Sequence, residues 1–252
     1  MTVDAPQNSN RIDATEPSRF ERLFGAAAND AKQLELTAGT SVFEPSTSAD
    51  NVYFIHTGQV RVYQVGPDDE LRLIEILGPN DWFGSAALAN TRSYGVRAVA
   101  VTRAVVSEVA ADKWQTALAS NPEVTTEVIG QLARRLQGAV EDAGRLVFDD
   151  CNERLVKTLL RFSHSAAATR RAEDGEVTLR ITHAQLAQAV GAARETISLA
   201  LTQLRQQNLL RTGRNQLFFS PKTLKDFAAT LQPQAPAANG ATAAAAAAAK
   251  TN

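Results

Sequence analysis

Residues Ile181 to Leu210 read ITHAQLAQAVGAARETISLALTQLRQQNLL and contain two short amphipathic helical patterns that meet at Gly191. The apolar positions of the two patterns recur at helical spacing: Leu186, Ala187, Val190, Ile197, Leu201 and Leu204. Glycine takes the left-handed conformation more easily than other residues, and a helix often ends on such a residue before the chain turns. This pattern predicts a helix-turn-helix, whose second helix enters the major groove of DNA.

Polar residues gather at the start of the second predicted helix. Arg194, Glu195 and Ser198 share its outward side, and Thr196 lies beside them. Thr182 caps the first helix. Arginine pairs with guanine, glutamate accepts from cytosine, and serine tolerates several bases. We therefore predict that these five residues contact DNA, although helical hairpins of the same pattern also serve as ordinary packing units.

The next segment, NLLRTGRNQLFFSP, predicts a β-hairpin with its turn at residues 212–215. Such a hairpin would be the wing of a winged helix-turn-helix, and Arg211 and Arg214 are placed where a wing meets phosphates. Between Arg180 and Lys225 seven basic residues stand against one acid, although the net charge of the chain is −1. A basic module on an acidic body suits contact with the DNA backbone.

The preceding part of the chain shows two further patterns. Residues 32–109 alternate apolar and polar side chains between glycines, which predicts an antiparallel roll or barrel. The sequence Ser120-Asn121-Pro122 then begins a helix that continues to about residue 146. Its apolar residues recur at steps of three and four: Val128, Leu132, Leu136, Ala139, Ala143 and Leu146. This seam predicts a parallel coiled coil with a second copy of the chain; packing on the chain's own roll is the alternative.

These patterns predict an α+β fold with an N-terminal antiparallel β-roll, a long dimerisation helix and a C-terminal winged helix-turn-helix. The predicted boundaries are a disordered N-terminus (1–18), the roll (19–119), the dimerisation helix (120–148), the DNA-binding domain (149–231) and a disordered alanine-rich tail (232–252). No apolar run reaches the ~18–20 residues of a membrane span, and the N-terminus lacks the apolar core of a secretory signal. We therefore predict a cytoplasmic protein without membrane contact.

Four stretches of the chain together resemble the Crp/Fnr superfamily of bacterial transcription regulators: YFIHTGQVRVY, ILGPNDWFG, NPEVTTEVIGQLARRLQ and GAARETIS. The resemblance runs from about Leu34 to Phe219. It implies that the roll is a jelly roll of the cyclic-nucleotide-binding type. It also implies a homodimer that binds double-stranded DNA, contacts RNA polymerase, and is controlled by an effector held between the roll and the dimer helix. It also implies base-reading roles for Arg194, Glu195 and Ser198. Leu199 stands where such regulators place an arginine, so one guanine contact is expected to be absent.

The predicted effector cassette, FGSAALANTRSYG, departs from that of cyclic-AMP binders in the superfamily. Ser85 replaces their ribose-binding glutamate, and Arg92-Ser93 match their phosphate-binding pair only with a gap. Ala139-Val140 replace their adenine-binding Thr-Ser. The overlapping stretch LANTRSYGVRAVAVT is also similar to the corresponding segment of cyanobacterial nitrogen-control regulators, which sense 2-oxoglutarate. In that reading Arg92 and Arg97, with Arg134 or Arg135, meet carboxylates.

Ion pairs with surface acids are the alternative explanation for these arginines. The sequence therefore leaves two outcomes open: a small anionic effector, either 2-oxoglutarate or a cyclic nucleotide, or regulation without a ligand. The expected effector-binding residues are Gly84, Ser85, Ala86, Arg92, Ser93, Arg97, Arg135 and Ala139.

Enzymatic and metal-binding functions find no support in the sequence. The only cysteine, Cys151, excludes a cluster held by four thiolates, and the three histidines, His56, His164 and His183, form no ligand pattern. No phosphate-binding loop, HExxH, GxSxG or dinucleotide fingerprint occurs. We expect no enzyme, no metal and no certain cofactor. A cyclic-nucleotide-binding regulatory protein that does not act through DNA is the remaining alternative, but the altered cassette and the recognition helix disfavour it.

Overall fold

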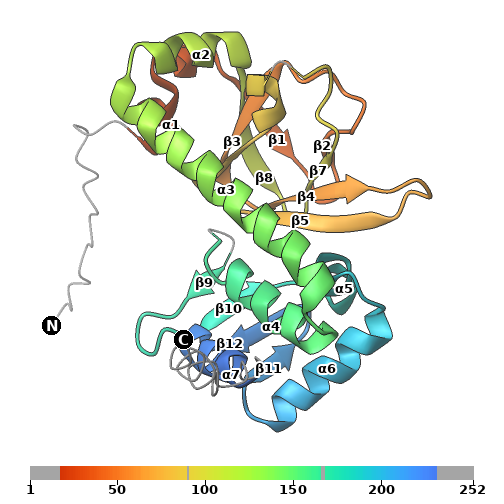
Figure 1. The fold of residues 1–252 in the computed structure, drawn as a ribbon. Coiled ribbons are helices and arrows are strands. Elements are labelled where there is room, and N and C mark those ends of the chain that lie inside the picture. Colours follow the sequence, from red (N-terminus) through yellow and green to blue (C-terminus); the bar gives the residue numbers. More distant parts are fainter. Residues whose placement is uncertain (1–17, 90, 166–167, 232–252) are drawn as a thin grey trace, which may run out of the picture.

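The computed structural model describes residues 18–231 apart from 90, 166 and 167. The two segments that we expected to be disordered, 1–18 and 232–252, therefore lie outside the described residues, apart from Ser18. Figure 1 shows a β-roll and a smaller α/β body, which lie at opposite ends of one long helix. In this part of the chain, no helix is both long and apolar enough to cross a membrane.

The roll contains eight strands: β1 (Lys32–Leu36), β2 (Ser41–Phe43), β3 (Asn51–Thr57), β4 (Val60–Val65), β5 (Leu71–Leu77), β6 (Trp82–Phe83), β7 (Arg97–Ala100) and β8 (Ala104–Ala110). They form two antiparallel sheets, ordered β1-β8-β3-β6 and β2-β7-β4-β5. Gly58 makes the turn between β3 and β4 at φ 86°, where a Cβ atom would overlap the carbonyl oxygen of Arg103. The predicted roll is thereby confirmed.

Short helical segments cover the roll: α1 (Arg19–Phe24), the 3-10 helices η1 (Gly25–Asp30) and η2 (Ser85–Ala89), and α2 (Ala111–Ala119). Ser18 caps α1, because its side chain accepts a hydrogen bond from the backbone N–H of Glu21. The largest side chains of the roll core are aromatic: Phe24, Phe54, Trp82, Phe83 and Trp114. Their burial supplies much of the hydrophobic stabilisation of this body.

The long helix α3 (Pro122–Phe148) begins as predicted, because Asn121 caps it and Pro122 occupies its first turn. The predicted seam is wrong in its first half. Val128 is buried in the roll core and Leu132 packs against that core, since this end of α3 lies on its own roll. Farther along, Leu136 remains 67% exposed.

The C-terminal body combines four helices with a four-stranded sheet. The helices are α4 (Cys151–Phe162), α5 (His183–Val190), α6 (Arg194–Gln206) and α7 (Pro221–Leu231). The strands are β9 (Thr169–Arg170), β10 (Val177–Arg180), β11 (Leu210–Gly213) and β12 (Gln216–Phe219). The sheet order is β11-β12-β10-β9, and β11 and β12 form the expected hairpin. The winged helix-turn-helix is confirmed.

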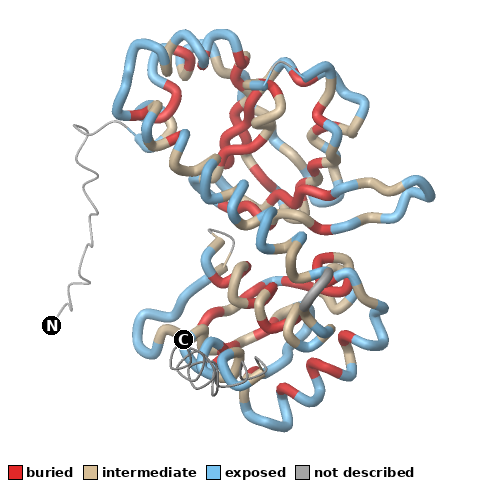
Figure 2. The backbone as a smooth tube through the Cα atoms, in the orientation of Figure 1, coloured by how far each residue is buried: buried red, intermediate tan, exposed pale blue. Residues whose placement is uncertain are grey.

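The two bodies touch directly as well as through α3. Tyr63, Leu73 and Ile76 of β4 and β5 belong to the apolar cluster that fills the C-terminal body. Arg61 of β4 donates a 2.6 Å hydrogen bond from Nη2 to the carbonyl oxygen of Arg180. Buried segments in Figure 2 lie inside both bodies, whereas the middle of α3 is largely exposed or intermediate. The C-terminal body is therefore docked on the β4–β5 side of the roll.

Candidate nucleic-acid interface

The helix-turn-helix is fixed by local hydrogen bonds at both ends of α5. The hydroxyl of Thr182 accepts from the backbone N–H of Gln185, and the Gln185 side chain accepts from the N–H of Thr182. At the other end, Gly191 adopts the left-handed conformation (φ 72°, ψ 50°), and its N–H donates to the carbonyl of Ala187. These contacts set the direction in which α6 leaves the turn.

The first turn of α6 presents polar side chains to solvent. Arg194, Glu195 and Thr196 are exposed, while the opposite face of the helix is buried: Ile197, Ala200, Leu201 and Leu204. The buried face holds α6 on its own domain, so the exposed residues keep a fixed geometry. Leu199 also lies outward and is 68% exposed, although its side chain is apolar.

Ser198, predicted on the same outward side, is engaged by neighbouring residues of the helix-turn-helix. It is partly buried, its hydroxyl donates to the carbonyl of Arg194 at 2.9 Å, and it lies 3.0 Å from Nδ1 of His183. His183 therefore has a hydrogen-bonding role inside the helix-turn-helix. This contact was missed from the sequence, where the two residues lie fifteen positions apart.

The two wing arginines have different surroundings. Arg211 donates from Nη2 to both carboxylate oxygens of Glu176 at 2.8 Å, and its guanidinium lies 5.2 Å from the centre of the Phe218 ring. Arg214 is exposed at the hairpin turn, next to Asn215 at φ 57°. Arg214 is the more available of the two to a DNA phosphate, because Arg211 would first have to break its hydrogen bonds with Glu176.

The predicted effector cassette surrounds the end of β6. Gly84 has φ 86°, and a Cβ atom there would lie 3.0 Å from the carbonyl oxygen of Asn51. Ser85 and Ala86 begin η2. Arg92 is exposed, and Ser93 forms an isolated β-bridge with Ser48.

Arg97 carries an ion pair within the roll. Its Nε lies 2.6 Å from Oε2 of Glu44, and this hydrogen bond lowers the pKa of the Glu44 carboxyl below its ordinary value. An ion pair with a surface acid was the alternative that the sequence left open for such arginines. In this structure Arg97 is thus engaged by its own roll.

The strand that leads into the cassette is tied to α3. Nε1 of Trp82 donates to Oε1 of Gln131 at 2.6 Å, and Nη2 of Arg135 donates to the carbonyl of Trp82 at 2.6 Å. The Arg135 guanidinium also lies 4.7 Å from the Trp82 ring centre and 3.5 Å from Oε1 of Glu75. Sequence reasoning singled out Arg135 but missed Trp82 and Gln131, although both lie in the stretches that resemble known regulators.

A hollow of about 700 Å³ lies between β5, α3 and α4, and we call it the α3 groove. Arg135 and Ala139 line it, whereas the other predicted effector residues are not among its lining residues. Both charge signs face it, including Glu75, Asp142 and Arg161. The structure thus places the predicted effector residues at three sites: the cassette, Arg97 on β7, and this groove.

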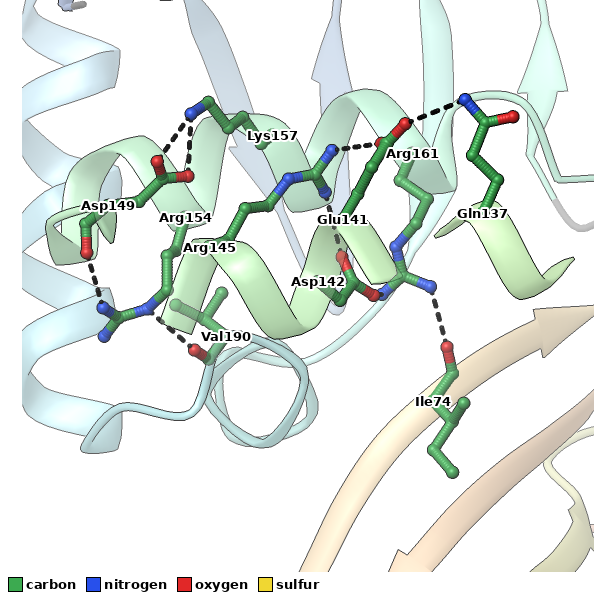
Figure 3. Close-up of polar contacts among 10 residues, drawn as sticks. All are labelled: Ile74, Gln137, Glu141, Asp142, Arg145, Asp149, Arg154, Lys157, Arg161 and Val190. Carbon is green, nitrogen blue, oxygen red and sulfur yellow. Dashed lines mark hydrogen bonds and ion pairs between the residues drawn. The ribbon is translucent and has the colours of Figure 1, made fainter. Parts of the chain in front are cut away.

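Figure 3 shows how the end of α3 is bound to α4. Both carboxylate oxygens of Asp149 accept from Nζ of Lys157, at 2.7 and 2.8 Å, and the Asp149 carbonyl accepts from Arg154. Arg154 also donates to the carbonyl of Val190 at the end of α5. These bonds connect the hinge after α3 directly to the helix-turn-helix.

A second set of contacts in Figure 3 reaches the roll. Nη1 of Arg161 donates to the carbonyl of Ile74 at 2.8 Å, and Nη2 lies 3.4 Å from Oδ2 of Asp142. Asp142 also pairs with Arg145 at 2.9 Å. Arg161 of α4 therefore contacts both α3 and β5.

Comparison with known proteins gives two family matches and several relatives. Residues 33–121 match the cyclic nucleotide-binding domain, and residues 153–227 match the Crp-like helix-turn-helix domain. The chain is 30% identical to the cAMP-activated global transcriptional regulator CRP of Salmonella typhimurium, over 68% of this chain and 81% of the relative. It is 28% identical to the CRP-like cAMP-activated global transcriptional regulator of Mycobacterium tuberculosis, over 78% and 85%.

A solved structure has a similar fold. FixK2 from Bradyrhizobium japonicum matches with a TM-score of 0.67 and 22% identity, over 81% of this chain and 98% of that chain. The two proteins therefore share the arrangement of roll, long helix and helix-turn-helix although their sequence identity is low.

Proposed function

The chain belongs to the Crp/Fnr superfamily of DNA-binding transcription regulators, and we propose that it binds a two-fold-symmetric DNA site as a homodimer under the control of a small effector. The observation that carries the proposal is the exposed polar first turn of α6, held on a buried apolar face. Recognition helices of this motif read bases with their N-terminal residues.

In this proposal Arg194 and Glu195 read base edges, and Thr196 and Ser198 support them. Thr182, Arg211 and Arg214 contact the DNA backbone. Base contacts give specificity, and phosphate contacts give affinity for any sequence. The two groups of residues therefore have separable effects on binding.

A gel-shift titration against promoter fragments tests DNA binding. Arg194→Ala is expected to weaken specific binding by about 1–3 kcal/mol and to relax one base position. Arg214→Ala is expected to weaken all sequences alike and to flatten the dependence of binding on salt. Arg22→Ala, which changes an exposed arginine on α1, is the control. Absence of binding to every fragment at low salt, with and without effectors, would refute the proposal.

A second copy of the chain fits the exposed apolar stripe of α3, and the following residues define this seam: Ile129, Ala133, Leu136, Val140 and Ala143. Their spacing of four and three residues is that of a coiled-coil seam. Ile129, Leu136 and Val140 are 60%, 67% and 64% exposed in the single chain. Covering such large apolar side chains favours association.

The effector proposal rests on the match to a cyclic nucleotide-binding domain and on the contacts between the cassette and α3. We propose a small anion, either a cyclic nucleotide or 2-oxoglutarate, held between the roll and α3. The cassette residues Gly84, Ser85, Ala86, Arg92 and Ser93 would contribute from the roll, together with Arg97 of β7. Arg135 and Ala139 would contribute from α3. A change at Trp82 would reach α3 through Gln131 and Arg135.

Thermal-shift titrations with cyclic AMP, cyclic GMP and 2-oxoglutarate test the effector proposal. A ligand that binds only the folded chain raises its apparent stability in proportion to the logarithm of ligand concentration. If none of the three shifts the transition, binding of these effectors is refuted, while DNA binding is judged separately by gel shift. As a regulator, the dimer would act on transcription by RNA polymerase.

A further inference from the structure

Arg61 is a buried arginine between the two bodies. It is 3% exposed, and its Nη2 donates to the carbonyl oxygen of Arg180. Its Nε and Nη1 have no hydrogen-bond partner among the described residues. Guanidinium groups stay charged in proteins, and a buried charge without a full set of partners is costly. The position therefore calls for a compensating negative group.

The space beside Arg61 is a groove between the roll and the C-terminal body, and we call it the Arg61 groove. It consists of two hollows of about 320 and 610 Å³ that share lining residues, among them Arg180 and Thr102. Arg214 lines the first hollow from the wing. None of the described residues that line either hollow is acidic. Three guanidinium groups thus line a space to which the described residues contribute no carboxylate.

Neutral hydrogen-bond donors complete the lining. The hydroxyl of Thr182 and the amides of Gln185 and Gln216 belong to the same surface. Hydroxyl and amide groups can orient phosphate or carboxylate oxygens, while arginine forks pair with them at two points. The donor set therefore matches a small anion with several charged oxygens.

The cationic hollow between α3 and α4 provides a contrast. It contains Arg145 and Lys157, which pair with acids at 2.9 and 2.7 Å. The charges of Arg145 and Lys157 are thus already balanced by the chain itself. At Arg61, balance has to come from outside the described residues.

We propose that the Arg61 groove binds a small multivalent anion that carries phosphate or carboxylate groups, and that this site is separate from the effector cassette and the α3 groove. The anion bridges the roll and the C-terminal body, so its binding favours their docked arrangement. Thr182 and Arg214 line the groove and are also proposed to contact DNA. The anion and DNA therefore compete for these two residues, and each weakens the binding of the other.

Calorimetric titration of the full chain tests the site without DNA. Inorganic pyrophosphate is the phosphate probe and citrate is the carboxylate probe, each at a fixed ionic strength set with sodium chloride. We expect saturable binding of at least one probe, and the two arms distinguish the anion classes. Loss of one charge-assisted contact should raise Kd about tenfold or more in Arg61→Gln and in Arg180→Gln. Arg22→Gln, on the distant helix α1, should bind like the parent chain.

Two results would overturn the proposal: no saturable binding of either probe, or equal binding by the parent chain and both groove variants. Arg180 is exposed, so Arg180→Gln keeps the test valid if Arg61→Gln does not fold. A competition assay then measures DNA affinity at saturating probe and constant ionic strength. We expect the probe to weaken DNA binding by the parent chain but not by Arg180→Gln. If the probe changes DNA affinity equally in both proteins, the competition is refuted. If the chain binds no DNA at all, the proposed function fails while the titration still decides the anion site.

Discussion

The indole Nε1 of Trp82 donates a 2.6 Å hydrogen bond to Oε1 of Gln131, which joins the strand before the cassette to α3. Trp82 is fully buried. Gln131 in turn donates from Nε2 to Glu127 one helical turn earlier. The amide of Gln131 therefore holds a buried donor of the roll in place against the helix.

Replacing Gln131 by alanine should destabilise the chain by about 1–3 kcal/mol, because the buried N–H of Trp82 would lose its acceptor. Chemical denaturation followed by tryptophan fluorescence measures the change. Gln137→Ala removes an exposed glutamine from the same helix and should alter stability by less than about 0.5 kcal/mol. Equal effects of the two variants would show that the Trp82 contact contributes little.

Introducing a carboxylate into the proposed seam should separate the dimer. Leu136 is 67% exposed in the single chain, and Leu136→Glu would place like charges against each other at the two-fold axis. Sedimentation velocity should show a shift toward monomer, with a dimer Kd raised at least tenfold. Gln115→Glu adds the same charge on α2 and should remain dimeric. A fully dimeric Leu136→Glu at low micromolar concentration would contradict the seam.

Leu199 should read a thymine methyl group in the bound DNA. It is 68% exposed on the outward side of α6, between Glu195 and Thr202, and apolar side chains contact this methyl in the major groove. Replacing the contacted thymine by uracil removes one methyl, which is worth about 0.8 kcal/mol or about fourfold in affinity. Filter binding with singly substituted duplexes measures the loss.

The control for this prediction is Leu199→Ala, which should bind thymine and uracil duplexes about equally. If the parent chain binds its site but no thymine-to-uracil change matters, Leu199 does not contact a methyl group. If no duplex is bound, the DNA-binding proposal itself fails.

His56 should make the roll less stable in mild acid. Burial lowers the pKa of its imidazole, which contacts the rings of Phe20 and Phe54 and lies 2.8 Å from the hydroxyl of Ser107. The unfolded chain takes up a proton near the ordinary value of about 6.5, while the folded chain resists it. Stability is therefore expected to fall as the pH drops from about 6.5 toward the lower folded pKa.

Thermal unfolding at several pH values measures this loss, with His56→Gln as the comparison. That variant keeps a hydrogen-bonding side chain but has no imidazole to titrate, so its stability should decline less between pH 7 and pH 5. His164→Gln is the matched control, because His164 is exposed. Identical pH profiles for the parent chain and His56→Gln would contradict the assignment.

The parts of the fold that depend on neighbouring residues were predictable from the sequence. The cap at Thr182, the left-handed turn at Gly191, the cap at Asn121 and the wing turn all arise within a few residues of chain. Backbone hydrogen-bonding needs and glycine's conformational freedom act at this range. The predictions of the helix-turn-helix and of the start of α3 were therefore confirmed.

Contacts between distant residues were not predictable in the same way. Val128 has an apolar side chain that suits either a dimer seam or the roll, and only the position of α3 assigns it to the roll. The Arg97–Glu44 ion pair spans 53 residues, and the bond from Arg61 to Arg180 spans 119. The spacing of arginines in the sequence does not show which residue, so many positions away, each arginine will contact. For that reason the sequence singled out arginines as candidate effector residues but did not resolve their surroundings.

The contacts of Arg161 affect how fast the C-terminal body can change its orientation. Because this one side chain bonds to β5 and pairs with α3, rotation about residues 149–150 alone would pull its guanidinium away from Ile74 and Asp142 together. Water has to enter and replace both partners before the body swings. In the proposed effector control, the activation barrier to such a reorientation would therefore include hydration of a partly buried arginine, and its time scale would depend on a residue that need not touch either DNA or effector.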